Sequence, residues 1–222
     1  LDNNLIAAKV LLGSTYMQMG DYDEAMKIYT PALKQSKELG DKVGMGSNLN
    51  NIGNVHADKG DLDTALDYYA RSLAIKEEIG DKLGMGSSLN NIGSVHSDKG
   101  DYDKALDYYG RSLAIREELG DKRGMGYSLN NIGGVHKDKG DYEKALDYYE
   151  RSLAIREELG DKRGMGYSLN GIGIVQIDKG DYEKALDYYG RSLATREELG
   201  DKRGIDRKST RLNSSHALIS YA

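Results

Sequence analysis

Apolar residues along the chain recur at steps of three and four, and a Gly-Asp dipeptide follows every 20 residues, from Gly20-Asp21 to Gly200-Asp201. In the stretch 141–160 the residues of this apolar stripe are Tyr142, Ala145, Leu146, Tyr149, Ser152 and Leu153. The spacing predicts an amphipathic helix, with the Asp141 carboxylate capping its first turn and Gly160 in the left-handed position after its end. The stretch 121–140 predicts a shorter helix capped by Asp121. Together they predict an antiparallel helix pair.

Two different phrases alternate between the Gly-Asp marks, so the repeating unit is 40 residues long. We predict an array over 1–204 with five tandem repeats, and their boundaries are 1–40, 41–80, 81–120, 121–160 and 161–200. The remainder, 201–222, is expected to be a degenerate half-repeat that forms a capping helix, although its last part also resembles a translated sequencing-adapter artefact. One helix pair cannot bury its apolar face alone, so neighbouring pairs must stack. The expected fold is all-α, an α-solenoid of antiparallel helix pairs.

Composition narrows the classes of function. Acidic residues exceed basic ones by 36 to 31, a net charge of −5, and this argues against a nucleic-acid partner because phosphates demand a basic surface. Cysteine is absent, so disulfides and thiolate metal sites are excluded. No apolar run approaches the roughly 20 residues of a membrane span, and no signal peptide is recognisable. We therefore expect no membrane association and a cytoplasmic location, for a chain that begins at Leu1 and is interpreted as a piece of a longer protein.

The order of small and large residues within one unit matches a known repeat. In the unit 121–160 this order is Leu129, Ile132-Gly133, His136, Gly140, Tyr142, Ala145, Tyr149 and Ser152. It resembles the tetratricopeptide repeat, in which Leu-Gly, Tyr, Ala and Phe follow at fixed offsets. The Trp, Phe and closing Pro of that pattern are replaced here by Leu, Tyr and a longer second helix. The 40-residue period resembles the subfamily of spindle-orientation adaptors and kinesin light chains, and the phrasing is similar to prokaryotic signalling arrays.

This resemblance implies a right-handed superhelix in which the first helix of each pair lines the concave side. The positions that the family geometry turns toward a partner are Asn50, Asn51, Asn54, Asn90, Asn91, Ser94, Tyr127, Asn130, Asn131, Lys137, Tyr167, Asn170 and Ile174. An Asn amide offers two donors and an acceptor to the backbone of an extended peptide. Tyr127 and Tyr167 would flank an apolar side chain. The alternative is that these Asn side chains only form hydrogen bonds within the protein.

His56, His96 and His136 recur once per repeat and invite a metal-site interpretation. Packed helices lie about 8–10 Å apart, whereas zinc needs nitrogens at about 2.0–2.1 Å, so we expect these rings to pack against the partner helix. The Gly-Met-Gly at 124–126 resembles the start of a dinucleotide-binding fingerprint, but Leu129 takes the place of the third glycine and no strand precedes it. No group of residues suits nucleophilic or acid–base catalysis. We predict no metal site, no cofactor and no enzyme activity.

The sequence therefore favours a non-enzymatic scaffold that binds a peptide or partner protein in a concave groove. Two alternatives stay open: a self-associating spacer array, forming a homo-oligomer through the ends of its repeats, and a regulatory region of a larger signalling protein. A clamp for a C-terminal carboxylate is disfavoured, because the position of its lysine holds Asn50, Asn90 or Asn130.

Overall fold

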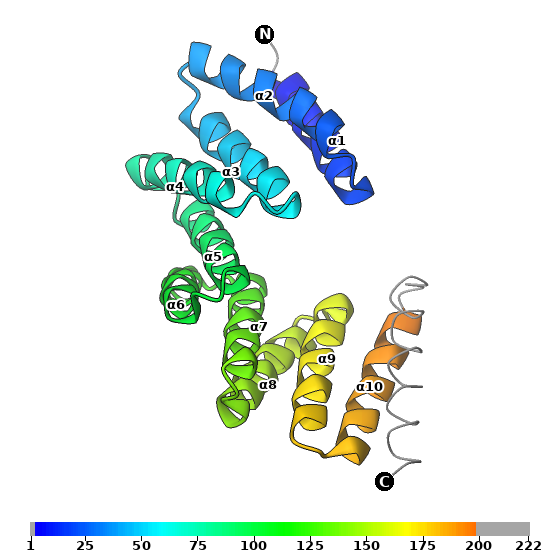
Figure 1. The fold of residues 1–222 in the computed structure, drawn as a ribbon. Helices are drawn as coiled ribbons and strands as arrows, with labels where there is room; N and C mark the ends of the chain where they lie inside the picture. Colours follow the sequence, from blue (N-terminus) through cyan, green and yellow to red (C-terminus); the bar gives the residue numbers. More distant parts are fainter. Residues whose placement is uncertain (1–2, 199–222) are drawn as a thin grey trace. The chain divides into compact units, whose positions relative to one another are not determined.

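A computed structural model describes residues 3–198, and the side chains from residue 9 onward. Helices make up all the regular structure of this part of the chain (Figure 1). In order they are α1 Asn3–Met19, α2 Tyr22–Glu38, α3 Lys42–Asp58, α4 Leu62–Glu78, α5 Lys82–Asp98, α6 Tyr102–Leu119, α7 Lys122–Asp138, α8 Tyr142–Glu158, α9 Lys162–Asp178 and α10 Tyr182–Glu197. The predicted all-α solenoid of helix pairs is confirmed. The predicted cap, 201–222, lies outside the described residues.

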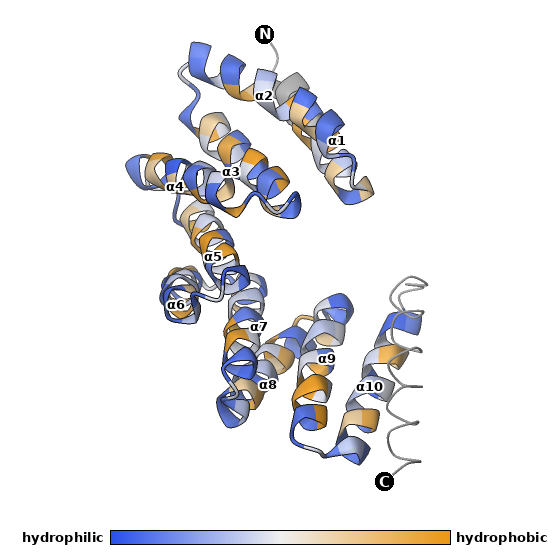
Figure 2. Ribbon diagram, in the orientation of Figure 1, coloured by the Kyte–Doolittle hydropathy of each residue, from blue (hydrophilic) through white to orange (hydrophobic). Residues whose placement is uncertain are grey.

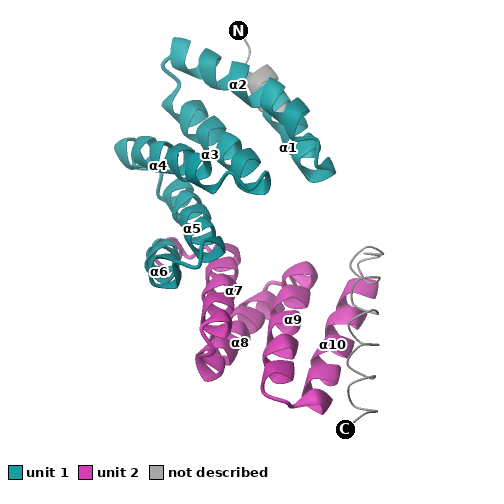
Figure 3. Cartoon of the chain, in the orientation of Figure 1, with its two compact units in different colours: residues 1–115 teal, residues 116–222 magenta. Residues whose placement is uncertain are grey.

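The chain divides into two compact units, residues 1–115 and 116–222, which Figure 3 colours separately. In the first unit α2 packs against α1 and α3, and α4 packs against α3 and α5. In the second unit α8 packs against α7 and α9, and α10 packs against α9. The first helices of neighbouring pairs also touch directly, α1 with α3, α3 with α5, and α7 with α9. Each unit therefore brings together the helices on which the sequence places the candidate site.

A glycine with a positive φ follows each helix from α1 to α9, as the sequence predicts. Gly60, between α3 and α4, has a φ of +81°, and Gly160 has a φ of +62°. This left-handed backbone conformation is favourable for glycine and strained for residues with a side chain. The Asp121 cap is confirmed, because its Oδ1 accepts a hydrogen bond from the Gly124 N–H at 3.0 Å.

Two other expectations about the helices are wrong. Asp141 makes no side-chain cap to α8. Its Oδ2 instead lies 3.3 Å from Nδ1 of His136, so the carboxylate contacts a side chain of the preceding helix, α7. The first helix of a pair is also not the shorter one, since α7 and α8 both have 17 residues.

The core is built from the facing sides of consecutive helices, and each helix carries both hydrophobic and hydrophilic residues (Figure 2). One cluster joins α4 and α5, and its buried members are Ala65, Tyr69, Leu73, Leu89, Ile92 and Val95. Helices of one pair approach closely at a glycine. A Cβ placed on Gly53 of α3 would lie 2.6 Å from Cε1 of Tyr69, so only glycine fits against that ring.

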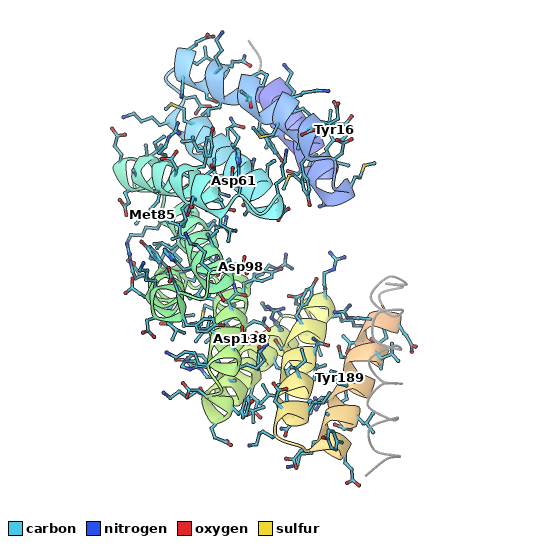
Figure 4. All side chains as sticks on the ribbon, viewed as in Figure 1. Tyr16, Asp61, Met85, Asp98, Asp138 and Tyr189 are labelled. Carbon is cyan, nitrogen blue, oxygen red and sulfur yellow. The ribbon has the colours of Figure 1, made fainter. Side chains whose placement is uncertain are left out.

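The three repeated histidines pack as expected. His56 stacks on Tyr68 of α4 with ring centroids 5.4 Å apart, and the guanidinium of Arg71 lies over the Tyr68 ring at 5.1 Å. Nδ1 of His56 also lies 3.1 Å from Oδ2 of Asp61, which Figure 4 labels between α3 and α4. His96 and His136 stack on the equivalent tyrosines. The predicted packing role is confirmed for all three. Within residues 3–198 no cluster of His, Cys, Asp and Glu could hold a metal ion.

Candidate functional site

Asparagine side chains connect the first helices of neighbouring pairs. In the first unit, Nδ2 of Asn91 on α5 donates to Oδ1 of both Asn50 and Asn54 on α3, each at 3.2 Å. Oδ1 of Asn50 also accepts from Oγ of Ser88 at 3.3 Å, and Oδ1 of Asn54 accepts from the Tyr69 hydroxyl at 2.8 Å. The amide oxygens of Asn50 and Asn54 therefore have partners inside the protein.

The N–H groups of these amides are in a different situation. Among the described residues, none accepts a hydrogen bond from Nδ2 of Asn50 or Asn54, and both side chains are only half-buried. The second unit repeats one such link, because Oγ of Ser168 on α9 donates to Oδ1 of Asn130 on α7 at 3.4 Å. The oxygens of Asn50 and Asn54 are thus used inside the protein, whereas their N–H donors have no acceptor among the described residues. The two readings of the sequence, internal hydrogen bonding and partner contact, are compatible.

The remaining predicted site residues have varied surroundings. Asn90, Asn131 and Asn170 already interact with other parts of the protein. Ser94 accepts a hydrogen bond from the Tyr109 hydroxyl at 3.0 Å, and Lys137 pairs with its neighbour Asp138 at 2.6 Å. Asn51 and Ile174 are half-buried.

Tyr127 and Tyr167 are half-exposed and lie over guanidinium groups, the buried one of Arg156 and the half-buried one of Arg196. Arg156 is centred 5.0 Å from the Tyr127 ring, and Arg196 lies 5.5 Å from the Tyr167 ring. Such cation–π contacts hold the rings in place. That these rings flank an apolar side chain of a partner stays a prediction.

A row of basic residues near the ends of the second helices was missed by sequence reasoning. Its members occur every 40 residues and are Lys76, Arg116, Arg156 and Arg196. The first three are at most 8% exposed. The side chains of the first three pass over the first turn of the following helix, so that a Cβ on Gly124 would lie 1.7 Å from Nη1 of Arg116. The Gly-Met-Gly segment therefore makes room for these side chains.

A pocket of about 320 Å³ opens between α3 and α5 within the first unit. Its lining residues are Ser47, Asn50, Asn51, Lys76, Asp81, Leu83, Gly84 and Ser87. Lys76 is 6% exposed, and its Nζ donates to the Gly84 carbonyl at 3.3 Å and to Oγ of Ser88 at 3.0 Å. Burial lowers the pKa of Lys76, and the nearby Asp81 carboxylate opposes that shift. Two predicted site residues, Asn50 and Asn51, thus share a pocket with a buried amine.

The sequence profile of the tetratricopeptide repeat matches residues 4–78, 44–118 and 124–198. The chain belongs to the tetratricopeptide repeat family, as the spacing of its small and large residues indicates. No curated protein matches the sequence. Repeats of this family typically form protein-interaction scaffolds.

Solved structures share the fold at low sequence identity. BtubC (BKLC) from P. vanneervenii is 23% identical with a TM-score of 0.75, over 89% of this chain and 82% of that one. The nearly identical repeats of a putative kinesin light chain from Podosopora anserina are 12% identical with a TM-score of 0.67, over 87% and 96%. A Rap protein complexed with competence and sporulation factor is 17% identical with a TM-score of 0.78, over 96% and 65%. The expected similarity to kinesin light chains is confirmed at the level of the fold.

None of the helices in the described part of the chain is long and apolar enough to cross a membrane. Apolar side chains are exposed on α1, where Leu11 is 71% and Met19 is 73% accessible. The alternatives of self-association through the array ends and of a regulatory role in a larger protein stay predictions.

Proposed function

We propose that this protein is a non-enzymatic, cytoplasmic scaffold whose first helices bind an extended peptide segment of a partner protein. The observation that carries the proposal is the pocket between α3 and α5, where side-chain donors of two neighbouring repeats converge. The Rap protein of similar fold is complexed with a factor, which supports the same kind of use for this array.

The asparagine amides would hold the peptide backbone. An extended chain presents a carbonyl oxygen at every residue, and the N–H groups of Asn50, Asn54 and Asn130, which have no acceptor among the described residues, are suited to donate to them. Their oxygens are already held by Asn91, Tyr69 and Ser168, so the amides are oriented before a partner arrives. Binding to such a fixed surface loses less conformational entropy than binding to free side chains. Because the asparagine amides contact only the backbone of the peptide, selectivity for particular peptide side chains would come from the residues that line the pocket.

The decisive variant replaces Asn54 and Asn130 together with aspartate. Each substitution keeps the acceptor oxygen used inside the protein and replaces the NH2 group, with its two N–H donors, by a second and negatively charged oxygen that can only accept. We expect peptides selected on the whole protein from a random display library to bind the double variant at least about tenfold more weakly, a loss of about 1.4 kcal/mol. Fluorescence anisotropy with labelled peptides measures the affinity.

The matched control is a variant with Ala70→Asp and Ala74→Asp, which adds the same two negative charges on the exposed surface of α4. It should leave the affinity for the selected peptides unchanged. If the double variant keeps its helical circular dichroism and binds as tightly as the control, the proposed groove is wrong.

A further inference from the structure

Lys76 carries a buried positive charge with incomplete compensation. Its amine has three N–H donors, and two of them are used on the uncharged acceptors Gly84 and Ser88. Among the described residues Lys76 forms no ion pair, although it is only 6% exposed. Removing an ammonium group from water is costly, and the nearby Asp81 carboxylate offsets this cost only in part, so a further anion beside Nζ would be favoured.

The pocket around Lys76 is rich in donors. The exposed hydroxyl of Ser47 and the amide of Asn51 have no hydrogen-bond partner among the described residues, and the N–H groups of Asn50, which also lines the pocket, have no acceptor there. The one carboxylate in the lining is Asp81, whose Oδ1 accepts from the Gly84 N–H at 2.9 Å as the cap of α5. A ligand that supplies acceptor oxygens and negative charge would satisfy both the amine and the surrounding donors.

We propose that this pocket receives the side-chain carboxylate of an aspartate or glutamate in the bound peptide, an inference that rests on the proposed function. A side chain fits better than a chain end, because the asparagine row continues beyond the pocket to Asn54 and Asn91. A peptide that follows this row continues past the pocket and presents a side chain there. The array is therefore selective for acidic peptides at the junction of α3 and α5.

In the second unit the residue equivalent to Lys76 is covered by an aromatic ring. Position 47 of the first unit corresponds to Tyr127 of the second, and Lys76 corresponds to Arg156. Tyr127 covers the Arg156 guanidinium at 5.0 Å, and Arg156 is 2% exposed. Nε and Nη1 of Arg156 are buried without a hydrogen-bond partner among the described residues, so a cation at this position is tolerated beneath a tyrosine. Ser47 is thus the residue that leaves Lys76 open to a ligand.

The test uses glutamate blocked as its N-acetyl and N-methylamide derivative, titrated into the ¹⁵N-labelled whole chain and followed by NMR. We expect saturable shifts of the Gly84 and Ser87 amide signals, and at least tenfold weaker binding of the equally blocked glutamine. Ser47→Tyr copies the Tyr127 arrangement and retains the lysine, and it should abolish the shifts. Lys76→Met should do the same, with folding checked by circular dichroism.

Two results would overturn the inference. One is a glutamate probe that fails to shift these signals or binds Ser47→Tyr as well as the unchanged protein. The other is that N-acetyl-alanine, which has a free terminal carboxylate, binds and the blocked glutamate does not. The pocket would then bind the C-terminal carboxylate of a peptide and not an acidic side chain. Because the probe is a single blocked residue, either result leaves the library-selected peptides and the asparagine variants as a separate test of the proposed function.

Discussion

Replacing Tyr69 with alanine is expected to lower the free energy of unfolding by about 4 kcal/mol, the range found when large buried aromatic residues are truncated. Tyr69 is 3% exposed, and its ring fills the space above Gly53. Its hydroxyl donates to Asn54 at 2.8 Å, so the substitution also removes a hydrogen bond that orients a proposed site residue. Tyr69 therefore links the core of the helix pair to the groove.

Urea unfolding followed by circular dichroism measures this loss. The matched control is Tyr69→Phe, which keeps the ring and removes only the hydroxyl, and its expected loss is about 1 kcal/mol. If the alanine variant were no less stable than the phenylalanine variant, the ring would not carry the packing assigned to it.

Replacing Gly53 with alanine is expected to destabilise the protein by about 2 kcal/mol, because extra atoms in a packed core force neighbours to shift. The added Cβ would lie 2.6 Å from Cε1 and 2.7 Å from Cδ1 of Tyr69. The ring has little freedom to retreat, since its hydroxyl is bound to Asn54. The cost should exceed the gain of about 1 kcal/mol that alanine brings to a helix.

Gly110 on α6 provides the control for that substitution. A Cβ there would meet nothing within 4 Å, so Gly110→Ala should stabilise the protein by up to about 1 kcal/mol. Urea unfolding of the two variants should therefore give opposite signs. Stabilisation by both would contradict close packing at Gly53.

The period and the apolar spacing were sufficient to predict the helices, their pairing and most of the core. Leu129, Ile132 and Val135 are all nearly fully buried, as their spacing indicates. The Asp141 cap was wrong for a physical reason. A carboxylate at a helix start has several possible donors, and His136 offers one from the preceding helix that local sequence does not reveal.

The candidate site could be predicted only in part. The family pattern places the asparagines on the first helices. Which of their amide atoms form hydrogen bonds inside the protein depends on pairs such as Asn50 and Asn91, which are 41 residues apart. Lys76 was overlooked because a charged residue at the end of a helix is usually solvated. The burial of Lys76 could have been predicted from its position, because it follows the buried Ser72 and Leu73 by four and three residues and so continues the apolar stripe.

In the proposed function a partner lies along the first helices of the array. The most direct measurement is an NMR map of the ¹⁵N-labelled protein with a peptide selected from the random library. We expect the largest shifts in amides of α3 and α5 or of α7 and α9. Largest shifts on the exposed faces of α4 and α8, with the first helices unaffected, would contradict it.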